Sequence, residues 1–499
     1  MELLSNLGLG LSVALGWQNL IYCFIGCFLG TLVGVLPGIG PVATVAMLLP
    51  FTFGLGPTPA LIMLAGIYYG AQYGGSTTAI LVNIPGESSS VVTTLDGHQM
   101  ARQGRAGPAL GIAAIGSFAA GCIATVVIAL FAPPLAELAL KFSPAEYFSL
   151  MVFGLVAAIV LARGSLIKAL AMVCLGLLLG MIGTDVNSGA IRFAFGQPEL
   201  ADGLGFVAIA MAFFGMADVV MNLEQPEQSG VYTSHIGSVL PTLDDLKTSF
   251  WSIVRGTALG SILGILPGGG ALLASFAAYM FEKKVARHPR RFGEGDIRGV
   301  AAPESANNAG AQTSFIPMLT LGIPSNPTMA LMIGAMMIQG IAPGPQVMTD
   351  RPELFWGLIA SMWLGNLMLL VLNLPLVGLW VRLLKVPYRL LFPSIFVFCC
   401  IGVYTVDTKI FDVYELAALT AVGYLLIKLD CEPAPLILGF VLGPLMEENL
   451  RRAMMIAQGD ASVFFSRPIS AGFLIAAVIL LAAIAAPTLR AKREEVLQE

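Results

Sequence analysis

The sequence predicts an all-α polytopic membrane protein with about 12 transmembrane segments and two inverted-topology repeats that contain re-entrant or broken helices. Hydrophobic residues make up 57% of the 499 residues and charged residues 11%, so a soluble fold would lack the polar side chains to cover its surface. No Asp, Glu, Lys, Arg or His occurs from residue 3 to residue 86, which is too long for one span. The third observation is an internal repeat.

The apolar segments give the order of the elements. Prolines divide the uncharged run into several spans or half-spans, at Pro37, Pro41, Pro50, Pro57 and Pro59. Because a span needs about 20 residues, we expect both whole helices and half-helices in the apolar stretches that follow. We divide the chain into a first repeat core at 17–110, connecting transmembrane helices at 111–249, an inverted second repeat core at 250–350, and C-terminal transmembrane helices with a cytoplasmic tail at 351–499.

The repeat consists of three matches in the same order. Gly30–Gly40 aligns with Gly260–Gly270 at an offset of 230, with six of eleven positions identical. Gly70-Ala71-Gln72 matches residues 310–312 at an offset of 240, and Ile84-Pro85 matches residues 323–324 at an offset of 239. Three matches in register indicate a duplicated unit.

The charges in the loops predict opposite orientations for the two copies. Lys and Arg mark cytoplasmic loops, here at Lys283–Arg298, Arg102 and Arg105, Arg163 and Lys168, and in the C-terminal tail at Arg490–Arg493. The basic 283–298 loop follows the first block of the second repeat, whereas the equivalent loop of the first repeat is uncharged. Inverted repeats of this kind support alternating access in secondary transporters. The alternative is a duplication in a purely structural membrane protein.

The Leu-Pro-Gly-x-Gly blocks interrupt apolar segments, and the backbone groups that they free must be satisfied by protein, water or ligand. We predict hairpins at 17–54 and 250–282 with Pro37 and Pro267 at their tips, the alternative being a pair of kinked helices. The backbone groups expected to face a substrate belong to Gly38, Gly40, Gly268 and Gly270.

Two polar clusters next to helix breakers complete the predicted site. Helix N-termini favour anions, and unwound carbonyls and hydroxyls favour Na⁺. The side chains expected to bind substrate are Ser76, Thr77, Thr78, Asn83, Ser325 and Asn326. Those expected to bind the cation are Glu87, Glu304, Asn307 and Asn308. The alternatives are that the hydroxyls bond within their own helices and that both glutamates lie at the membrane interface. Asp185, Asp202 and Asp218 are weaker candidates, expected at helix ends.

Several other functions find no support in the sequence. It has no P-loop and no His-Glu-x-x-His motif, no basic stripe for nucleic acid, and no cluster of metal ligands around its seven cysteines. We therefore predict no enzyme activity, no cofactor, and no metal other than a coupling Na⁺.

Six motifs together resemble those of the large membrane subunit (TctA type) of bacterial tripartite tricarboxylate transporters; they are Gly30–Gly40, Tyr68–Ser76, Asn83–Glu87, Asp96–Met100, Pro303–Ala309 and Leu321–Pro324. The resemblance implies a multi-pass protein of the bacterial inner membrane that imports a carboxylate, such as citrate, by cation symport, usually with Na⁺. It also implies a periplasmic solute-binding protein and a small membrane subunit as partners, with the lipid bilayer around them. A passive carboxylate channel and a non-transporting scaffold or receptor subunit are the alternatives. Elevator-like movement of the hairpins would follow only by analogy with other inverted-repeat carriers.

Overall fold

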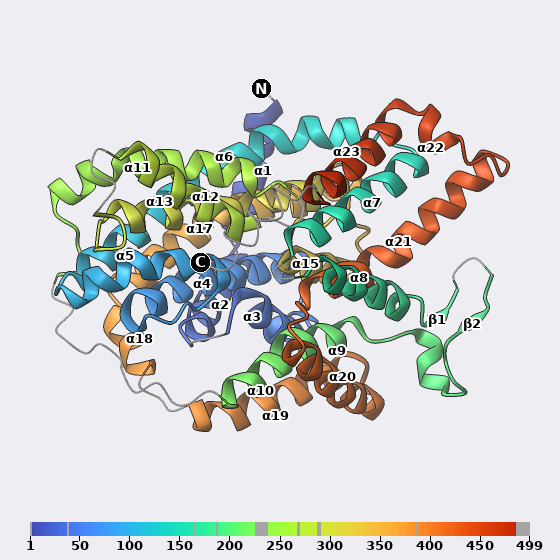
Figure 1. Ribbon diagram of the computed structural model, residues 1–499, viewed down its shortest axis with the longest axis horizontal. Coiled ribbons are helices and arrows are strands. Elements are labelled where there is room, and N and C mark those ends of the chain that lie inside the picture. Colours follow the sequence, from blue (N-terminus) through green and yellow to red (C-terminus); the bar gives the residue numbers. More distant parts are fainter. Residues whose placement is uncertain are drawn as a thin grey trace.

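The computed structural model describes residues 2–36, 39–162, 165–185, 188–224, 238–266, 270–286, 291–384 and 388–485 (Figure 1). Within these ranges the fold is helical apart from one antiparallel ribbon, formed by β1 (Gly183–Thr184) and β2 (Ile191–Arg192). The predicted all-α class is therefore confirmed for the described residues.

The first repeat begins with a helical hairpin. The helices α2 (Trp17–Gly34) and α4 (Pro57–Val82) run side by side in the same direction, because Gly26, Gly30 and Gly34 pack in turn on the backbone of Met63, Ile67 and Ala71. Between them lies α3 (Pro41–Leu48), extended by a 3-10 turn over Leu49–Thr52. Only residues 53–56 join this turn to the start of α4, so α3 must run back alongside α2.

The first repeat continues past the end of α4. Asn83 ends this helix in the left-handed conformation (φ 61°), and the chain folds back so that Gly86 packs against Gly75. The next helix, α5 (Val91–Arg102), then passes the end of α4, with Gly97 against Ile80. The second interruption is thus a return loop beside an intact helix.

The second repeat has the same elements. Gly256 and Gly260 of α11 (Leu243–Leu263), and Gly264 just after its end, pack on Ala302, Ala306 and Gly310 of α13 (Arg298–Thr313). The returning helix of this hairpin is α12 (Gly270–Val285). After α14 (Phe315–Leu321) and a return loop, the chain enters α15 (Pro327–Ile338).

The two repeats correspond residue by residue. The helices that carry the packing glycines, α2 and α11, are related by an offset of 230 residues. The helices on which these glycines pack, α4 and α13, are related by an offset of 239 residues. The offset of 239 continues to Asn83 and Gly322, both left-handed, and to Glu87 and Asn326, both extended N-cap residues. Hence Gly310 is equivalent to Ala71, one residue away from the register suggested by the Gly-Ala-Gln match.

Further helices surround the repeats. In Figure 1, α7, α8, α21 and α23 form a group at the right, and α9, α10, α19 and α20 lie below the repeats. The remaining helices are α1 (Glu2–Ala14), α6 (Ala106–Ala139), α7 (Pro144–Leu161), α8 (Leu166–Gly180), α9 (Phe206–Ala210), α10 (Ala217–Glu224), α16 (Gln346–Asp350), α17 (Pro352–Asn373), α18 (Val377–Leu383), α19 (Tyr388–Asp407), α20 (Ile410–Lys428), α21 (Ala434–Ile456), α22 (Val463–Ser466) and α23 (Pro468–Ala485).

In the described part of the chain, six helices are long and apolar enough to cross a membrane: Trp17–Gly34, Ala106–Ala139, Pro144–Leu161, Phe206–Glu224, Pro352–Asn373 and Ile410–Lys428. Shorter apolar helices include Leu166–Gly180 and Pro327–Ile338. The protein is therefore a helical membrane protein, while the total of about 12 spans stays a prediction.

Contacts between the repeats define two faces of the molecule. At the first, which we call the basic face (residues 102–105, 243–248 and 291–298), Arg105 pairs with Asp245 at 2.5 Å and Gln103 Nε2 donates to the Glu294 carbonyl at 2.7 Å. Burial on its own would raise the pKa of Asp296, but its bonds to Arg298 outweigh burial and lower the pKa. At the second, the distal face (residues 49–56 and 338–352), Gln339 Nε2 donates to the Thr52 carbonyl at 3.3 Å.

Candidate functional site

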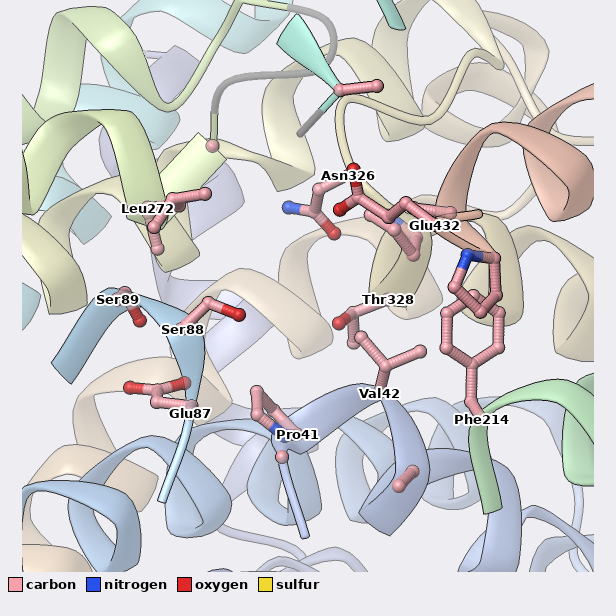
Figure 2. A pocket seen from close by; sticks show the side chains of 18 of the residues that line it. Pro41, Val42, Glu87, Ser88, Ser89, Phe214, Leu272, Asn326, Thr328 and Glu432 are labelled. Atoms are coloured by element: carbon pink, nitrogen blue, oxygen red, sulfur yellow. The ribbon is translucent and has the colours of Figure 1, made fainter. Parts of the chain in front are cut away.

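A cavity of about 770 Å³ lies between the two repeats and the segment that joins α20 to α21. Figure 2 shows Glu87, Ser88 and Ser89 of the first repeat on one side and Asn326 and Thr328 of the second repeat across from them. Its size lies within the range of small-molecule sites, which span about 300–1,000 Å³.

Several helices begin at this cavity. A helix N-terminus carries a partial positive charge and N–H groups without intrahelical partners, and it stabilises an anion by about 0.3–1 kcal/mol, or up to about 2 in a partly buried site. The residues of these N-termini that line the cavity are Gly40 and Pro41 (α3), Glu87 and Ser88 (before α5), Gly270 and Ala271 (α12), Asn326 and Pro327 (α15), and Pro433 and Ala434 (α21). Their convergence suits a ligand with several negative groups.

The ionisable side chains of the cavity are all acidic. Glu87, Asp218, Asp430 and Glu432 line it, and no Lys, Arg or His does so among the described residues. An anion bound here would gain from the helix N-termini but would also face carboxylates. A cation bound beside the anion would compensate these negative charges.

The two repeats contribute equivalent parts of the cavity, which we call half-sites. In the first half-site Gly40 lies beside Glu87, and a Cβ on Gly40 would be 3.9 Å from the Glu87 Cβ. In the second half-site Gly270 lies beside Asn326, and a Cβ on Gly270 would be 3.4 Å from the Asn326 Cβ. Gly270 also has a positive φ of 43°, a conformation that favours glycine.

Each half-site is contacted by the opposite repeat. Asn307 Nδ2 donates to Glu87 Oε1 at 2.7 Å, and the Tyr68 hydroxyl lies against the Asn326 amide. Tyr68 and Asn307 are themselves equivalent at the offset of 239. In the orientation that satisfies its amide, Gln72 also donates to the Glu87 carboxylate.

A second carboxylate lies behind the cavity. Glu304 is 0% exposed, and its two oxygens accept hydrogen bonds from the hydroxyls of Ser76, at 2.5 Å, and Thr93. Asn308, one turn along α13, donates to Ser117 Oγ at 2.6 Å and to the Glu304 carbonyl. Four elements thus enclose Glu304 in a network of neutral polar groups.

Comparison with known proteins assigns the chain. The pattern of the family described as "Tripartite tricarboxylate transporter TctA family" matches residues 20–438. The chain belongs to the TctA family. The resemblance that the motifs indicate is thereby confirmed.

Two proteins of Agrobacterium vitis are similar to this TctA protein. One, described as an uncharacterized 52.8 kDa protein in TAR-I ttuC' 3'region, is 57% identical over 499 residues, which are 100% of this chain and 99% of the relative. The other, described as an uncharacterized protein in TAR-II ttuC' 3'region, is 58% identical over 240 residues, which are 48% of this chain and 99% of the relative. No solved structure matches the chain.

The predicted site residues of the TctA chain fall into four groups. Those that line the cavity are Gly40, Glu87, Gly270 and Asn326. Those that contact or adjoin Glu87 and Glu304 behind the lining are Ser76, Asn307 and Asn308, with Glu304 itself. Gly38 and Gly268, like Pro37 and Pro267, lie outside the described residues.

The other predicted residues are not among those that line the cavity. Thr78 Oγ1 donates to the Val35 carbonyl at 2.8 Å, Thr77 to the Tyr73 carbonyl at 3.4 Å, and Ser325 to the Ser314 carbonyl at 3.3 Å. Asn83 is exposed at the end of α4. Thr77, and Thr78 through a further bond to the Gly74 carbonyl, match the alternative in which hydroxyl groups bond within their own helices. Ser325 bonds to another segment, and the substrate role of these residues stays a prediction.

Sequence reasoning missed the part of the cavity that lies outside the repeats. Asp218, regarded as a helix-end residue, lines the cavity with Phe214. Asp430 and Glu432 line it from the link between α20 and α21. The signal was the polar, proline-containing stretch Asp430–Pro435 between two apolar segments, which resembles the breaks inside the repeats.

Proposed function

We propose that this TctA protein is the membrane subunit of a secondary active transporter that imports a carboxylate across the bacterial inner membrane by Na⁺ symport. The carboxylate is a tricarboxylate such as citrate, or a related di- or monocarboxylate. A periplasmic solute-binding protein delivers it, and a small membrane subunit completes the assembly. The C-terminal tail, outside the described residues, would lie in the cytoplasm.

The observation that carries this proposal is the convergence of helix N-termini on a cavity whose ionisable side chains, within the described part of the chain, are acidic. The N-termini supply the attraction for an anion, while Glu87 supplies a ligand for a cation that binds with it. A carrier in which substrate and cation compensate each other's charge is one that transports both.

Contacts at the two faces support inverted repeats. The end of α5 meets the start of α13 at the basic face, and the end of α15 meets the end of α3 at the distal face. Equivalent ends of the repeats, those of α5 and α15, therefore lie on opposite faces. Inverted repeats with a site at their interface can expose that site to each side in turn.

Reconstitution of the complete assembly in proteoliposomes tests the proposal. Labelled citrate and a panel of mono- and dicarboxylates are offered with the binding protein, under an inward Na⁺ gradient or with K⁺ in its place. We expect at least one carboxylate to accumulate only under the Na⁺ gradient. Equal uptake in both conditions would indicate a passive channel, and no uptake of any carboxylate would indicate a scaffold or receptor subunit.

A further inference from the structure

We propose that the two half-sites have divided the ligands between them: the first holds the coupling cation at Glu87, and the second holds a carboxylate of the substrate at the N-terminus of α15. This inference rests on the function proposed above. It assigns a place to each ligand within the same cavity.

The argument begins with the equivalence of the half-sites. In the first half-site Gly40, the residue just before α3, lies beside Glu87. In the second, Gly270, the first residue of α12, lies beside Asn326. Glu87 and Asn326 are both N-cap residues that follow a return loop. The return loops also pack alike: Gly86 lies against Gly75, and Ser325 bonds to Ser314, its partner at the same offset. The backbones differ in detail, since Glu87 caps the 3-10 turn Ser88–Ser90 before α5 whereas Asn326 caps α15 directly. Within this shared arrangement the side chains decide which ligand each half-site prefers.

The N-cap side chain is what differs. Glu87 is 7% exposed and brings a carboxylate to the start of its helix, where it offsets the positive end of the helix dipole and repels a second anion. Asn326 is neutral, so the positive end of α15 keeps its attraction for an anion. Its Oδ1 accepts from the Met329 N–H at 2.9 Å and its Nδ2 donates to Ser314 Oγ at 3.0 Å.

The surroundings strengthen this difference. Glu304 lies behind the first half-site and adds a second negative group there. The second half-site has the hydroxyl of Thr328, which can donate to a carboxylate, and Tyr68 adjoins both Asn326 and Glu87. Figure 2 also shows Glu432 on that side, but Glu432 belongs to neither repeat and is partly exposed, so water screens its charge more than that of Glu87.

The cation assignment is tested with sodium alone. The thermal unfolding midpoint of the purified complete transporter is compared in NaCl and in KCl without substrate. We expect Na⁺ to raise the unfolding midpoint of the wild type and of Asn326→Asp. We expect Na⁺ to have no effect on the midpoint of Glu87→Asn or of Glu87→Gln. Glu87→Gln is included in case Glu87→Asn does not fold. Asp202→Asn, which removes an exposed carboxylate far along the chain, is the control and should respond as the wild type does.

The exchange of the two side chains provides a sharper test. Glu87→Asn combined with Asn326→Glu moves the carboxylate to the equivalent place in the other repeat, and we expect the response to Na⁺ to return. The assignment is overturned if Glu87→Asn and Glu87→Gln respond to Na⁺ normally, if the response is lost in Asn326→Asp or Glu432→Gln instead, or if the wild type shows no response.

The carboxylate assignment is tested with citrate at saturating Na⁺. A carboxylate introduced by Asn326→Asp repels the substrate, and we expect the citrate concentration for half-maximal uptake to rise by at least about tenfold while the response to Na⁺ persists. An unchanged citrate requirement would overturn this half of the inference. If no carboxylate is transported by the wild type although Na⁺ acts through Glu87, the proposed function fails and the cation assignment stands.

Discussion

Glu304 shows at the scale of single residues how this protein keeps a carboxylate away from water. Both of its oxygens accept hydrogen bonds from hydroxyl groups, and no described Lys or Arg pairs with it. Removing one donor leaves the buried charge with less compensation, which costs about 1–3 kcal/mol.

We therefore expect Ser76→Ala to lower the free energy of unfolding by about 1–3 kcal/mol. The measurement is thermal or denaturant unfolding of the purified protein in detergent. Ser12→Ala is a matched control, since the Ser12 hydroxyl is exposed and bonds only to its own helix. If both variants unfold alike, the Ser76 bond to Glu304 contributes nothing to stability.

The sequence singled out several polar residues at this scale, because polar groups in an apolar context are conspicuous, but it missed Asp430 and Glu432 of the cavity lining. Glu87, Glu304 and Asn326 could be singled out for that reason. What it could not show is which way each side chain turns: Ser76 and Asn326 come from similar polar clusters, yet one faces Glu304 and the other the cavity.

At the scale of elements, the glycines of α2 and α11 determine how closely these helices approach α4 and α13. A Cβ on Gly30 would lie 2.3 Å from the Ile67 carbonyl oxygen, and one on Gly260 would lie 2.4 Å from that of Ala306. Backbone atoms cannot yield as a flexible side chain can. Glycine has the same packing role in both repeats. The sequence match shows the shared glycines, but it does not distinguish close packing from flexibility as the reason for them.

Gly30→Ala and Gly260→Ala should each destabilise the protein by about 1–3 kcal/mol through overpacking. Gly8→Ala on α1 is the control, because a Cβ there would meet nothing within 4 Å and alanine favours the helix. Unfolding midpoints of the three variants provide the comparison. Equal stability of Gly30→Ala and Gly8→Ala would mean that α2 and α4 do not pack as described.

The element boundaries were harder to anticipate. Prolines and glycines mark both return loops, but the sequence could not distinguish a helix that breaks and continues from a chain that folds back beside an intact helix. The difference depends on Gly86 reaching Gly75, a contact that only the folded chain reveals.

At the scale of the whole molecule, the proposed inverted repeats make a claim about sidedness. Thr349 lies at the distal face and Lys283 close to the basic face, and both are exposed. Because basic loops stay in the cytoplasm, we expect Thr349→Cys to react with a membrane-impermeant thiol reagent in intact cells and Lys283→Cys to react only after permeabilisation. Labelling of the wild type measures the background reaction of the native cysteines. Labelling of both positions from the same side would contradict the inverted arrangement.

The sidedness that charge and repetition indicate stays a prediction, and so does the number of spans that hydropathy indicates. Half-helices and long helices have similar composition, so counting apolar stretches could not reveal which ones cross the bilayer. Six helices are long enough in the described residues, and the contribution of the shorter ones depends on how they pair in the membrane.

Asp96 joins the two repeats at the basic face. It is 0% exposed and accepts hydrogen bonds from the backbone of Gly293, Gly295 and Asp296 and from the Tyr279 hydroxyl. At the distal face, Gln339 Nε2 donates to the Thr52 carbonyl. A motion that pulled α5 away from the second repeat would strand a buried charge, so during transport the two copies should travel together as one rigid body relative to the surrounding helices.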